Sequence, residues 1–358
     1  MPENPRITFP VLSLLHHGGV RVLIHIMNHL ALEGYRVRVV VPAHRYNPAI
    51  PLDPQVEVIR VSVPLPGKPG LLQALLRVGR ALPPSDAVVA NFFPTFFPAR
   101  SFARRSGIPM LYYVQDREDW FYPFPLNRIA RHTYQDPSVR YLFASTWLRN
   151  SLGLPGEVVP PGVEGFWPDP DPELLEAKGD RLAVLYLWRP ERRKGAHLFL
   201  QALHRLKPPV PVEVWIVGKV PPERIQVPEA LPFRVFGYLD THFLRKVYSS
   251  ADLFVHTSLF EGFGLPPLEA MACGTAVVLT DSGGVREFAR HGENAWLVKE
   301  KEPEAIARAL QRVLAQPSLR EALRSGGLDT ARRFPIRRTA QRFEAVLRSA
   351  LQARHTEG

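Results

Sequence analysis

The chain has 358 residues, of which 46% are hydrophobic and 22% charged, a balance typical of folded domains and not of disordered protein. Its single cysteine, Cys273, excludes an internal disulfide and a cysteine-based metal cluster. The net charge of +11 favours anionic partners, but there is no zinc-finger spacing, RNP-type aromatic motif or arginine-rich tail, so we expect no nucleic-acid partner.

The sequence also bears on location. No run of about 18 apolar residues appears, and the N-terminal stretch MPENPRITFP lacks the charged and apolar regions of a signal peptide. We therefore expect a cytoplasmic protein.

Short apolar runs alternate with helical patterns along the first half of the chain. The predicted strands are 7–15, 37–41, 56–61, 87–91, 110–114 and 141–144, and the predicted helices are 20–33, 71–82 and 100–106. Alternation of this kind predicts a parallel sheet covered by helices on both faces.

The second half repeats the scheme. Its predicted strands are 182–187, 212–217, 253–256, 276–280 and 295–298, and its predicted helices are 196–206, 241–249, 266–272 and 285–290. We therefore expect an α/β protein with two Rossmann-like domains, at 1–165 and 166–335, joined within the Gly-, Pro- and Asp-rich stretch 153–173. The segment 336–358 has Phe343, Val346, Leu347 and Leu351 at helical spacing, which predicts a helix that crosses back to the first domain.

Open parallel sheets bind ligands beyond the carboxyl ends of their strands, so the strand-to-helix loops are where chemistry is expected. In the first such loop, Gly18 and Gly19 follow a strand and open a helix, where backbone N–H groups and the helix dipole favour an anion. A tight turn is the alternative explanation for the glycine pair.

The corresponding loop of the second half is LYLWRPERRKGAHLFL, residues 185–200. It carries Arg189 and Lys194, with Gly195 at the helix entrance. A guanidinium binds phosphate oxygens in a bidentate manner and an ammonium adds a point charge, so the pair suits a diphosphate. A solvated charged loop is the alternative.

A third loop, FEGFGLPPLEAMACG, combines phosphate-binding and phosphate-repelling features. Gly262, Phe263 and Gly264 present backbone N–H groups ahead of a helix whose first turn holds Pro266. Because a carboxylate accepts hydrogen bonds from two neighbouring hydroxyls, Glu261 and Glu269 can bind polyol groups on either side of a phosphate. Helix capping is an alternative for Glu269, expected in or near the first turn, but not for Glu261.

The stretch SLFEGFGLPPLEAMACGTAVVLTDSGGVREFARHGENAWLV resembles the signature segment of retaining, nucleotide-sugar-dependent glycosyltransferases of family 4. Their Glu-x7-Glu motif matches Glu261 and Glu269, and their diphosphate-binding pair matches Arg189 and Lys194. The resemblance implies the GT-B fold, in which two Rossmann-like domains face each other across a cleft.

The resemblance also implies roles for individual residues. Glu261 would contact the transferred sugar, Glu269 the ribose, and Arg189 with Lys194 the diphosphate. The remaining donor-site positions are Gly19 from the first domain, Gly237 and Tyr238 near the base, and Gly262, Phe263, Gly264 and Leu265 along the loop.

Where many family members carry an acceptor-side histidine, this chain reads YYVQDREDWFYPF, with Gln115 and Asp116. Asp116 is our candidate acceptor-side catalytic contact, beside Glu261, Arg189 and Lys194; a helix cap is the alternative. The family needs no metal, and we interpret Asp169-Pro170-Asp171 as linker. We expect no cofactor other than the nucleoside diphosphate sugar as co-substrate.

The function expected from the resemblance is a retaining hexosyl transfer of the EC 2.4 class, from a nucleoside diphosphate sugar to a hydroxyl of a glycan, a lipid-linked molecule or a small molecule. A non-catalytic sugar-nucleotide or glycan-binding subunit is one alternative. An epimerase-type Rossmann enzyme is another, although the GxGxxG fingerprint is absent.

Two segments raise the hypothesis of peripheral contact with an anionic membrane at its inner face. Residues 91–105 mix Phe96, Phe97 and Phe102 with arginines, and residues 71–82 are basic and amphipathic. Core-facing helices with solvated basic sides are the alternative.

Overall fold

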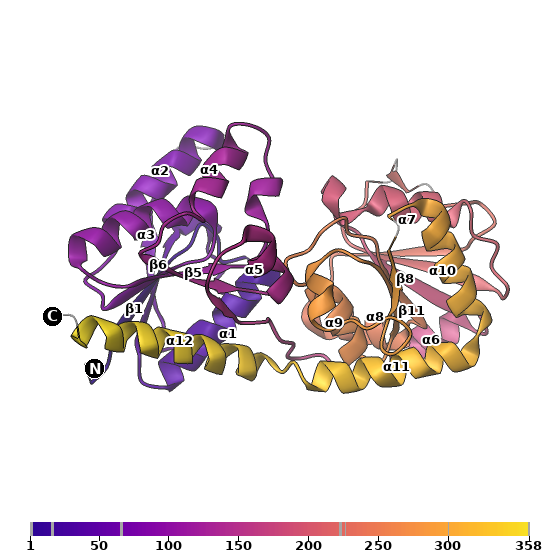
Figure 1. Cartoon of the computed structure of the whole chain (residues 1–358). Coiled ribbons are helices and arrows are strands. Elements are labelled where there is room, and N and C mark those ends of the chain that lie inside the picture. The colour runs from indigo at the N-terminus through magenta and orange to yellow at the C-terminus, as the bar shows by residue number, and fades with distance from the viewer. Residues whose placement is uncertain are drawn as a thin grey trace. The chain divides into compact units, whose positions relative to one another are not determined.

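The computed structural model describes residues 3–15, 18–64, 67–221, 224–225, 227–299 and 301–356. The chain divides into two compact units, Met1–Pro161 with Ile336–Gly358, and Gly162–Pro335. Each unit is a parallel sheet with helices on both faces, which confirms the predicted α/β class (Figure 1).

The first unit is built on a seven-stranded sheet of order β3-β2-β1-β4-β5-β6-β7. Its strands are β1 (Arg6–Pro10), β2 (Arg36–Pro42), β3 (Glu57–Val61), β4 (Ala87–Ala90), β5 (Met110–Val114), β6 (Val139–Phe143) and β7 (Glu157–Val158). Its helices are α1 (Gly18–Leu32), α2 (Gly67–Arg80), α3 (Phe93–Ser106), α4 (Leu126–His132), α5 (Thr146–Leu152) and α12 (Ile336–Thr356).

Consecutive side chains of β5 show how this sheet is covered. Tyr112 and Tyr113 are fully buried and, because side chains alternate along a strand, point to opposite faces. Tyr112 packs against Phe96 of α3, whereas Tyr113 meets Phe343 of α12. The C-terminal helix, drawn in yellow in Figure 1, therefore belongs to the first unit, where it lies alongside α1.

The second unit has a six-stranded sheet of order β10-β9-β8-β11-β12-β13. Its strands are β8 (Leu182–Leu187), β9 (Val212–Val217), β10 (Phe233–Gly237), β11 (Leu253–His256), β12 (Ala276–Thr280) and β13 (Trp296–Val298). Its helices are α6 (Pro172–Lys178), α7 (Ala196–Leu203), α8 (Thr241–Ser250), α9 (Leu265–Ala272), α10 (Pro303–Ala315) and α11 (Pro317–Arg332).

Among the differences from the sequence prediction, four have a local physical reason. The first strand ends at Pro10, not at residue 15, because proline has no N–H to continue the ladder. Helix α3 begins at Phe93, not at residue 100, with Pro94 in its first turn and Pro98 accommodated inside it. The predicted helix 285–290 is a short 3₁₀ turn, Gly284–Glu287, because the Asn294 side chain binds the following backbone. The edge strand β10 has no predicted counterpart, since its exposed Phe233 and Val235 blur the apolar pattern.

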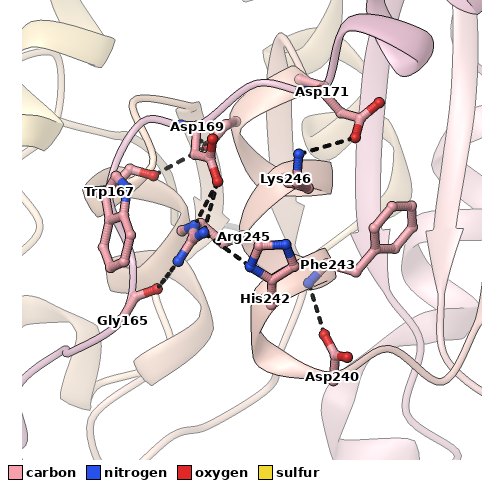
Figure 2. Close-up of polar contacts among 11 residues, drawn as sticks. Gly165, Trp167, Asp169, Asp171, Asp240, His242, Phe243, Arg245 and Lys246 are labelled. Carbon is pink, nitrogen blue, oxygen red and sulfur yellow. Dashed lines mark hydrogen bonds and ion pairs between the residues drawn. The ribbon is translucent and has the colours of Figure 1, made fainter.

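The segment that leads into α6 is held on α8 by a cluster of polar contacts (Figure 2). The Arg245 guanidinium lies 3.8 Å over the ring of Trp167 and donates to Asp169 at 3.0 and 2.7 Å. The Arg245 hydrogen bond lowers the pKa of Asp169. Asp171 caps α6 and pairs with Lys246 at 3.3 Å. Both aspartates of the Asp-Pro-Asp sequence are thus bound to α8.

Buried aromatic side chains account for α3, which contains most of the basic aromatic segment 91–105. Phe96 and Phe102 are 4% and 9% exposed, and Phe97 is 39% exposed. Arg100 pairs with Asp136, while Arg104 and Arg105 lie on the solvent side. This helix is therefore core-facing with a solvated basic side, which was the alternative to lipid contact.

A buried carboxyl group fixes the start of α3. Glu118 is 3% exposed and accepts hydrogen bonds from the Phe93 N–H at 2.6 Å and the Tyr112 hydroxyl at 2.8 Å. Burial raises the pKa of Glu118 to about 8, against the effect of these two donors, and Asp116 and Asp119 raise it further. The folded state therefore favours the protonated carboxyl group up to about this pH.

Replacing Glu118 with Gln is expected to make thermal stability less dependent on pH. A pKa that is higher in the folded than in the unfolded chain gives stability that is full below about pH 4.5 and is lost as pH rises to about 8. The melting temperatures of Glu118→Gln and the parent should therefore be similar at pH 5, and the variant's should be higher at pH 8.5. Glu176→Gln, the same change at an exposed position, is the control. Parallel pH profiles for all three proteins would contradict the assignment.

Candidate active site

The candidate site lies where the second sheet changes direction. Strands β8, β9 and β10 progress to one side of the sheet, and β11 then returns to the other side of β8. The loops that follow β8 and β11 therefore lie at the carboxyl ends of adjacent strands, the usual ligand position in an open α/β sheet. Lys194 comes from the first of these loops and Glu261 from the second, so the fold brings the two predicted residues together.

Glu261 is surrounded by hydrogen-bond donors. Its two carboxylate oxygens accept from Lys194 Nζ at 2.7 and 2.9 Å. Oε1 also accepts from the Ser258 hydroxyl at 2.7 Å. His256 Nε2 lies 3.2 Å from Oε1 without the alignment of a hydrogen bond, so we treat it as an electrostatic contact. Oε1 is therefore crowded, and Oε2 has the fewer contacts.

The charge of Glu261 is maintained although the side chain is only 6% exposed. Burial alone would raise its pKa, but the ammonium of Lys194 and the nearby His256 hold the pKa of this carboxyl well below its usual range. The site thus contains a buried carboxylate that stays ionised at neutral pH.

Gly195 makes the pairing of the two loops possible. Its φ is +71°, and a Cβ at this position would lie 1.9 Å from the Thr257 carbonyl oxygen. In return, Thr257 Oγ1 donates to the Gly195 carbonyl at 2.8 Å, and the Tyr186 hydroxyl donates to the Lys194 carbonyl at 3.0 Å. The Lys194 backbone is therefore fixed against the end of β11.

The loop from Glu261 to Gly264 is supported by the segment after β12, in which Gly284 allows close contact. The Glu261 N–H donates to the Ser282 carbonyl at 2.8 Å, and the Gly284 N–H donates to the Glu261 carbonyl at 3.0 Å. A Cβ on Gly284 would lie 2.3 Å from the Gly262 carbonyl carbon and oxygen. The backbone of the loop therefore has its position set by direct contact with the segment after β12.

Two predicted donor-loop residues have structural roles that the motif does not reveal. Phe263 is 4% exposed and packs on Phe288 and Phe334, so its side chain anchors the loop in the core and only its backbone can meet a ligand. Leu265 is half-buried as the first residue of α9.

Glu269 lies in the second turn of α9, which begins at Leu265. It is therefore too far from the helix start for the capping role, because the dipole acts mainly within the first turn. The side chain is 3% exposed and accepts a hydrogen bond of 3.4 Å from Tyr248 of α8. Glu269 is thus a second buried carboxyl group on the helix that follows the loop.

The other predicted donor residues of this unit lie at the same end of the sheet. Arg189 lies two residues after the end of β8 and is exposed. Gly237 ends β10 with φ +69° and accepts from the Gly218 N–H at 2.6 Å. Tyr238, the next residue, is 60% exposed.

Gly19 and Asp116 belong to the first unit. Gly19 lies in the first turn of α1, and a Cβ there would lie 2.6 Å from Gln115 Oε1. Asp116 follows β5; its carboxylate accepts from the Arg117 N–H at 2.9 Å and its carbonyl from Glu118. Asp116 therefore opens the turn into the 3₁₀ helix Glu118–Trp120.

Sequence reasoning missed three residues. Ser258 and His256 contact Glu261, and Glu118 is the buried carboxyl group of the first unit. The first two lie within five residues of Glu261, and the predicted strand 253–256 already placed both at the same sheet edge, although their contact with Glu261 was not predicted. Among the residues that the structure describes, no group of three or more His, Cys, Asp or Glu side chains is placed to hold a metal ion.

Comparison with protein families gives two matches that together span most of the chain. Residues 169–329 match the model described as glycosyl transferases group 1, and residues 17–146 match the glycosyl transferase 4-like domain.

Curated relatives match over shorter stretches. A D-inositol 3-phosphate glycosyltransferase of Geodermatophilus obscurus is 31% identical over 216 residues, covering 54% of this chain and 47% of that protein. A lipopolysaccharide core biosynthesis mannosyltransferase of Rhizobium leguminosarum bv. viciae is 35% identical over 174 residues, covering 46% and 49%. The matched region thus spans about half the length of these two relatives.

Solved structures match over almost the whole chain. Sucrose-phosphate synthase from Thermosynechococcus elongatus has a TM-score of 0.81 at 20% identity, with 98% of this chain and 100% of that chain covered. Anabaena HepE in complex with UDP-glucose has a TM-score of 0.75 at 18% identity, with 97% and 100% covered. At these identities the likeness concerns the fold, which is the expected GT-B fold.

Replacing Gly284 with Ala is expected to destabilise the second unit by about 1–3 kcal/mol, because the new methyl group would overlap the Gly262 carbonyl. Urea unfolding of the purified protein measures the change. Ser282→Ala is a matched control in the same segment, since it removes a buried hydroxyl that has no partner among the described atoms and adds no volume. Equal stability of the two variants would show that the loop is not held by this contact.

Proposed function

The chain belongs to the glycosyltransferases of the group 1 and family 4-like type, and from this premise we propose that it transfers a sugar from a nucleoside diphosphate sugar to an acceptor hydroxyl with retention. The observation that carries the proposal is the ion pair of Lys194 with the buried, ionised Glu261 at the point where the second sheet changes direction. The solved complex of HepE with UDP-glucose, a protein of the same fold, supports this donor class.

The first step of the proposal concerns the diphosphate. An ammonium has three N–H donors, and Glu261 accepts from Lys194 with both oxygens, which leaves one donor for a phosphate oxygen. The exposed guanidinium of Arg189 can add a bidentate contact. Both cations stabilise the negative charge that develops on the leaving diphosphate, so the proposal requires no metal ion.

The second step concerns the sugar. Glu261 Oε1 is already occupied by Lys194 and Ser258, so Oε2 is the oxygen we assign to a sugar hydroxyl. Holding the carboxylate with three neighbours limits its rotation, which favours one orientation of the bound sugar. Glu269, on the next helix, is assigned to the ribose hydroxyls of the donor.

In the proposed reaction the bond between the anomeric carbon and the diphosphate oxygen breaks. A bond from the acceptor oxygen to the anomeric carbon forms on the same face, and the acceptor proton passes to the departing diphosphate. Asp116 remains the candidate for an acceptor-side contact, although its carboxylate already binds the Arg117 N–H. The protein's contribution is thus orientation and charge stabilisation.

A non-catalytic sugar-nucleotide or glycan-binding subunit is the alternative from another class. Such a protein needs the donor contacts but does not need Glu261 to be held in one orientation. Release of nucleoside diphosphate in the presence of acceptors separates the two functions, and a subunit without activity would show donor binding alone.

Glu261→Gln is expected to affect mainly turnover, and Glu269→Gln mainly donor affinity. Glu261→Gln should lower turnover at least tenfold with a smaller effect on nucleoside diphosphate affinity, because it removes a contact to the transferred sugar. Glu269→Gln should weaken donor affinity, seen as a smaller thermal shift with the same ligand. Nucleoside diphosphate release and thermal-shift titration over a panel of donors provide both measurements.

Glu176→Gln controls for the loss of one carboxylate at an exposed position. If both site variants had the turnover and donor affinity of this control, the roles assigned to the two glutamates would be wrong. Loss of folding in Glu261→Gln is recognised by its melting temperature without ligand.

We further propose that α2 contacts an anionic membrane, which would suit a lipid-linked acceptor. Leu71, Leu72 and Leu76 are 48%, 63% and 54% exposed, and the last turn of α2 carries Arg77 and Arg80. Exposed leucines beside arginines are the features of an interfacial helix. None of the described helices has both the length and the apolar character needed to span a bilayer.

Serine at positions 71, 72 and 76 together is expected to reduce flotation with phosphatidylglycerol vesicles at least tenfold, since each leucine that enters the interface contributes roughly 1.5–3 kcal/mol. Leu32→Ser, at a site 69% exposed in α1, is the control for loss of a surface leucine. Flotation that is equal for the triple variant and the control, or absent in the parent, would refute membrane contact by α2.

A further inference from the structure

A surface groove lies between the edge strand β13 and helix α10, outside the candidate active site. Its volume is about 290 Å³, and it is lined by Trp296, Leu297, Val298, Ala305, Arg308, Ala309 and Arg312. Two alanines one turn apart on α10 leave the space, and two arginines one turn apart border it. The groove therefore combines an apolar floor with two cationic side chains on one helix face.

The orientation of Arg312 is fixed before any ligand binds. Its guanidinium lies 4.8 Å over the ring of Trp296. The ring of His291 packs against the same indole with 4.4 Å between centroids, and His291 Nδ1 accepts from the Leu297 N–H at 3.2 Å. A stacked guanidinium keeps its N–H edges available in its own plane, so less side-chain freedom is lost when it binds an anion.

The positive charge of the groove is only partly offset within the described part of the chain, where the carboxylate of Glu304 interacts electrostatically with Arg308. Neither Arg308 nor Arg312 has an ion pair there. Glu304, one turn before Arg308, pairs with Arg205. Two guanidinium groups that form no ion pair among the described residues, beside an aromatic wall, are a typical arrangement for binding a phosphate group.

The groove differs from the donor site in position. Strand β12 separates β13 from β11, which leads into the Glu261 loop. Its volume of about 290 Å³ is at the lower limit of small-molecule pockets, which hold about 300–1,000 Å³. A ligand of sugar-phosphate size fits this space better than a complete nucleotide sugar.

We propose that the groove formed by Trp296, Arg308 and Arg312 is a second binding site, specific for a phosphate monoester carried on a small polar molecule or on a lipid headgroup. The phosphate is held by the two guanidinium groups, and the attached polar group lies along Trp296 and the alanine floor. The site is independent of the proposed transfer reaction, because none of its residues contacts Lys194, Glu261 or Glu269 in the described structure.

The test measures the Kd of the full-length protein for glucose 6-phosphate, at constant ionic strength because surface charges are screened by salt. The variants are Arg308→Ser with Arg312→Ser, and, as a matched control, Arg104→Ser with Arg332→Ser, which removes the same charge at exposed positions. Lys194→Ala distinguishes binding at the donor site. Glucose serves as the probe without phosphate, and vesicles containing phosphatidic acid as the lipid source.

We expect the Kd for glucose 6-phosphate or for the vesicles to rise at least tenfold in Arg308→Ser/Arg312→Ser and to be unchanged in the control pair and in Lys194→Ala. The probe that responds identifies the source of the phosphate. Any of three results would overturn the proposal. The two double variants could bind both probes with equal affinity, Lys194→Ala could lose binding, or glucose could bind as tightly as glucose 6-phosphate. Both arginines are exposed, so the variants should fold, and their melting temperatures check this.

Discussion

The second unit depends on keeping one buried carboxylate charged. An isolated ionised group at the exposure of Glu261 would be neutralised by protonation, because desolvation disfavours the charged form. Lys194 prevents this, and it reaches Glu261 only because the loops after β8 and β11 meet at the same edge of the sheet. The charge of the site is therefore a consequence of strand order.

That constraint explains why glycines occur where they do. Gly195 and Gly284 lie so close to neighbouring carbonyl groups that any side chain would separate the loops they join. A change of a few tenths of an ångström at either position would alter the distance between Lys194 and Glu261. The first role of Gly195 and Gly284 is therefore to let one loop backbone pack against another, and any phosphate contact is secondary.

The sequence predicted what periodicity and motif spacing encode, and missed what depends on tertiary contact. Buried strands such as β8 and β9 were placed to the residue, because parallel strands covered on both faces are continuous apolar runs. Lys194 and Glu261 were singled out separately, from the loop positions and the family resemblance, but the ion pair between them was not predicted. Ser258 as a partner of Glu261, the raised pKa of Glu118, and the stacking of Arg312 on Trp296 were not predictable, since each joins elements whose contacts no local pattern records.

The two sheets share one topology but differ in the charge at their carboxyl ends. In both, the fourth strand returns to the far side of the first. The second unit places a cation against a carboxylate there, whereas the first unit has Glu118, whose pKa near 8 favours the neutral acid, on hydrogen bonds from a backbone N–H and a tyrosine. A nucleoside diphosphate sugar requires positive charge to bind, and an acceptor hydroxyl does not. Under the proposed division between donor and acceptor, the cations therefore lie on the donor side, whereas the buried acid of the first unit is neutral beside the Arg117–Asp119 ion pair.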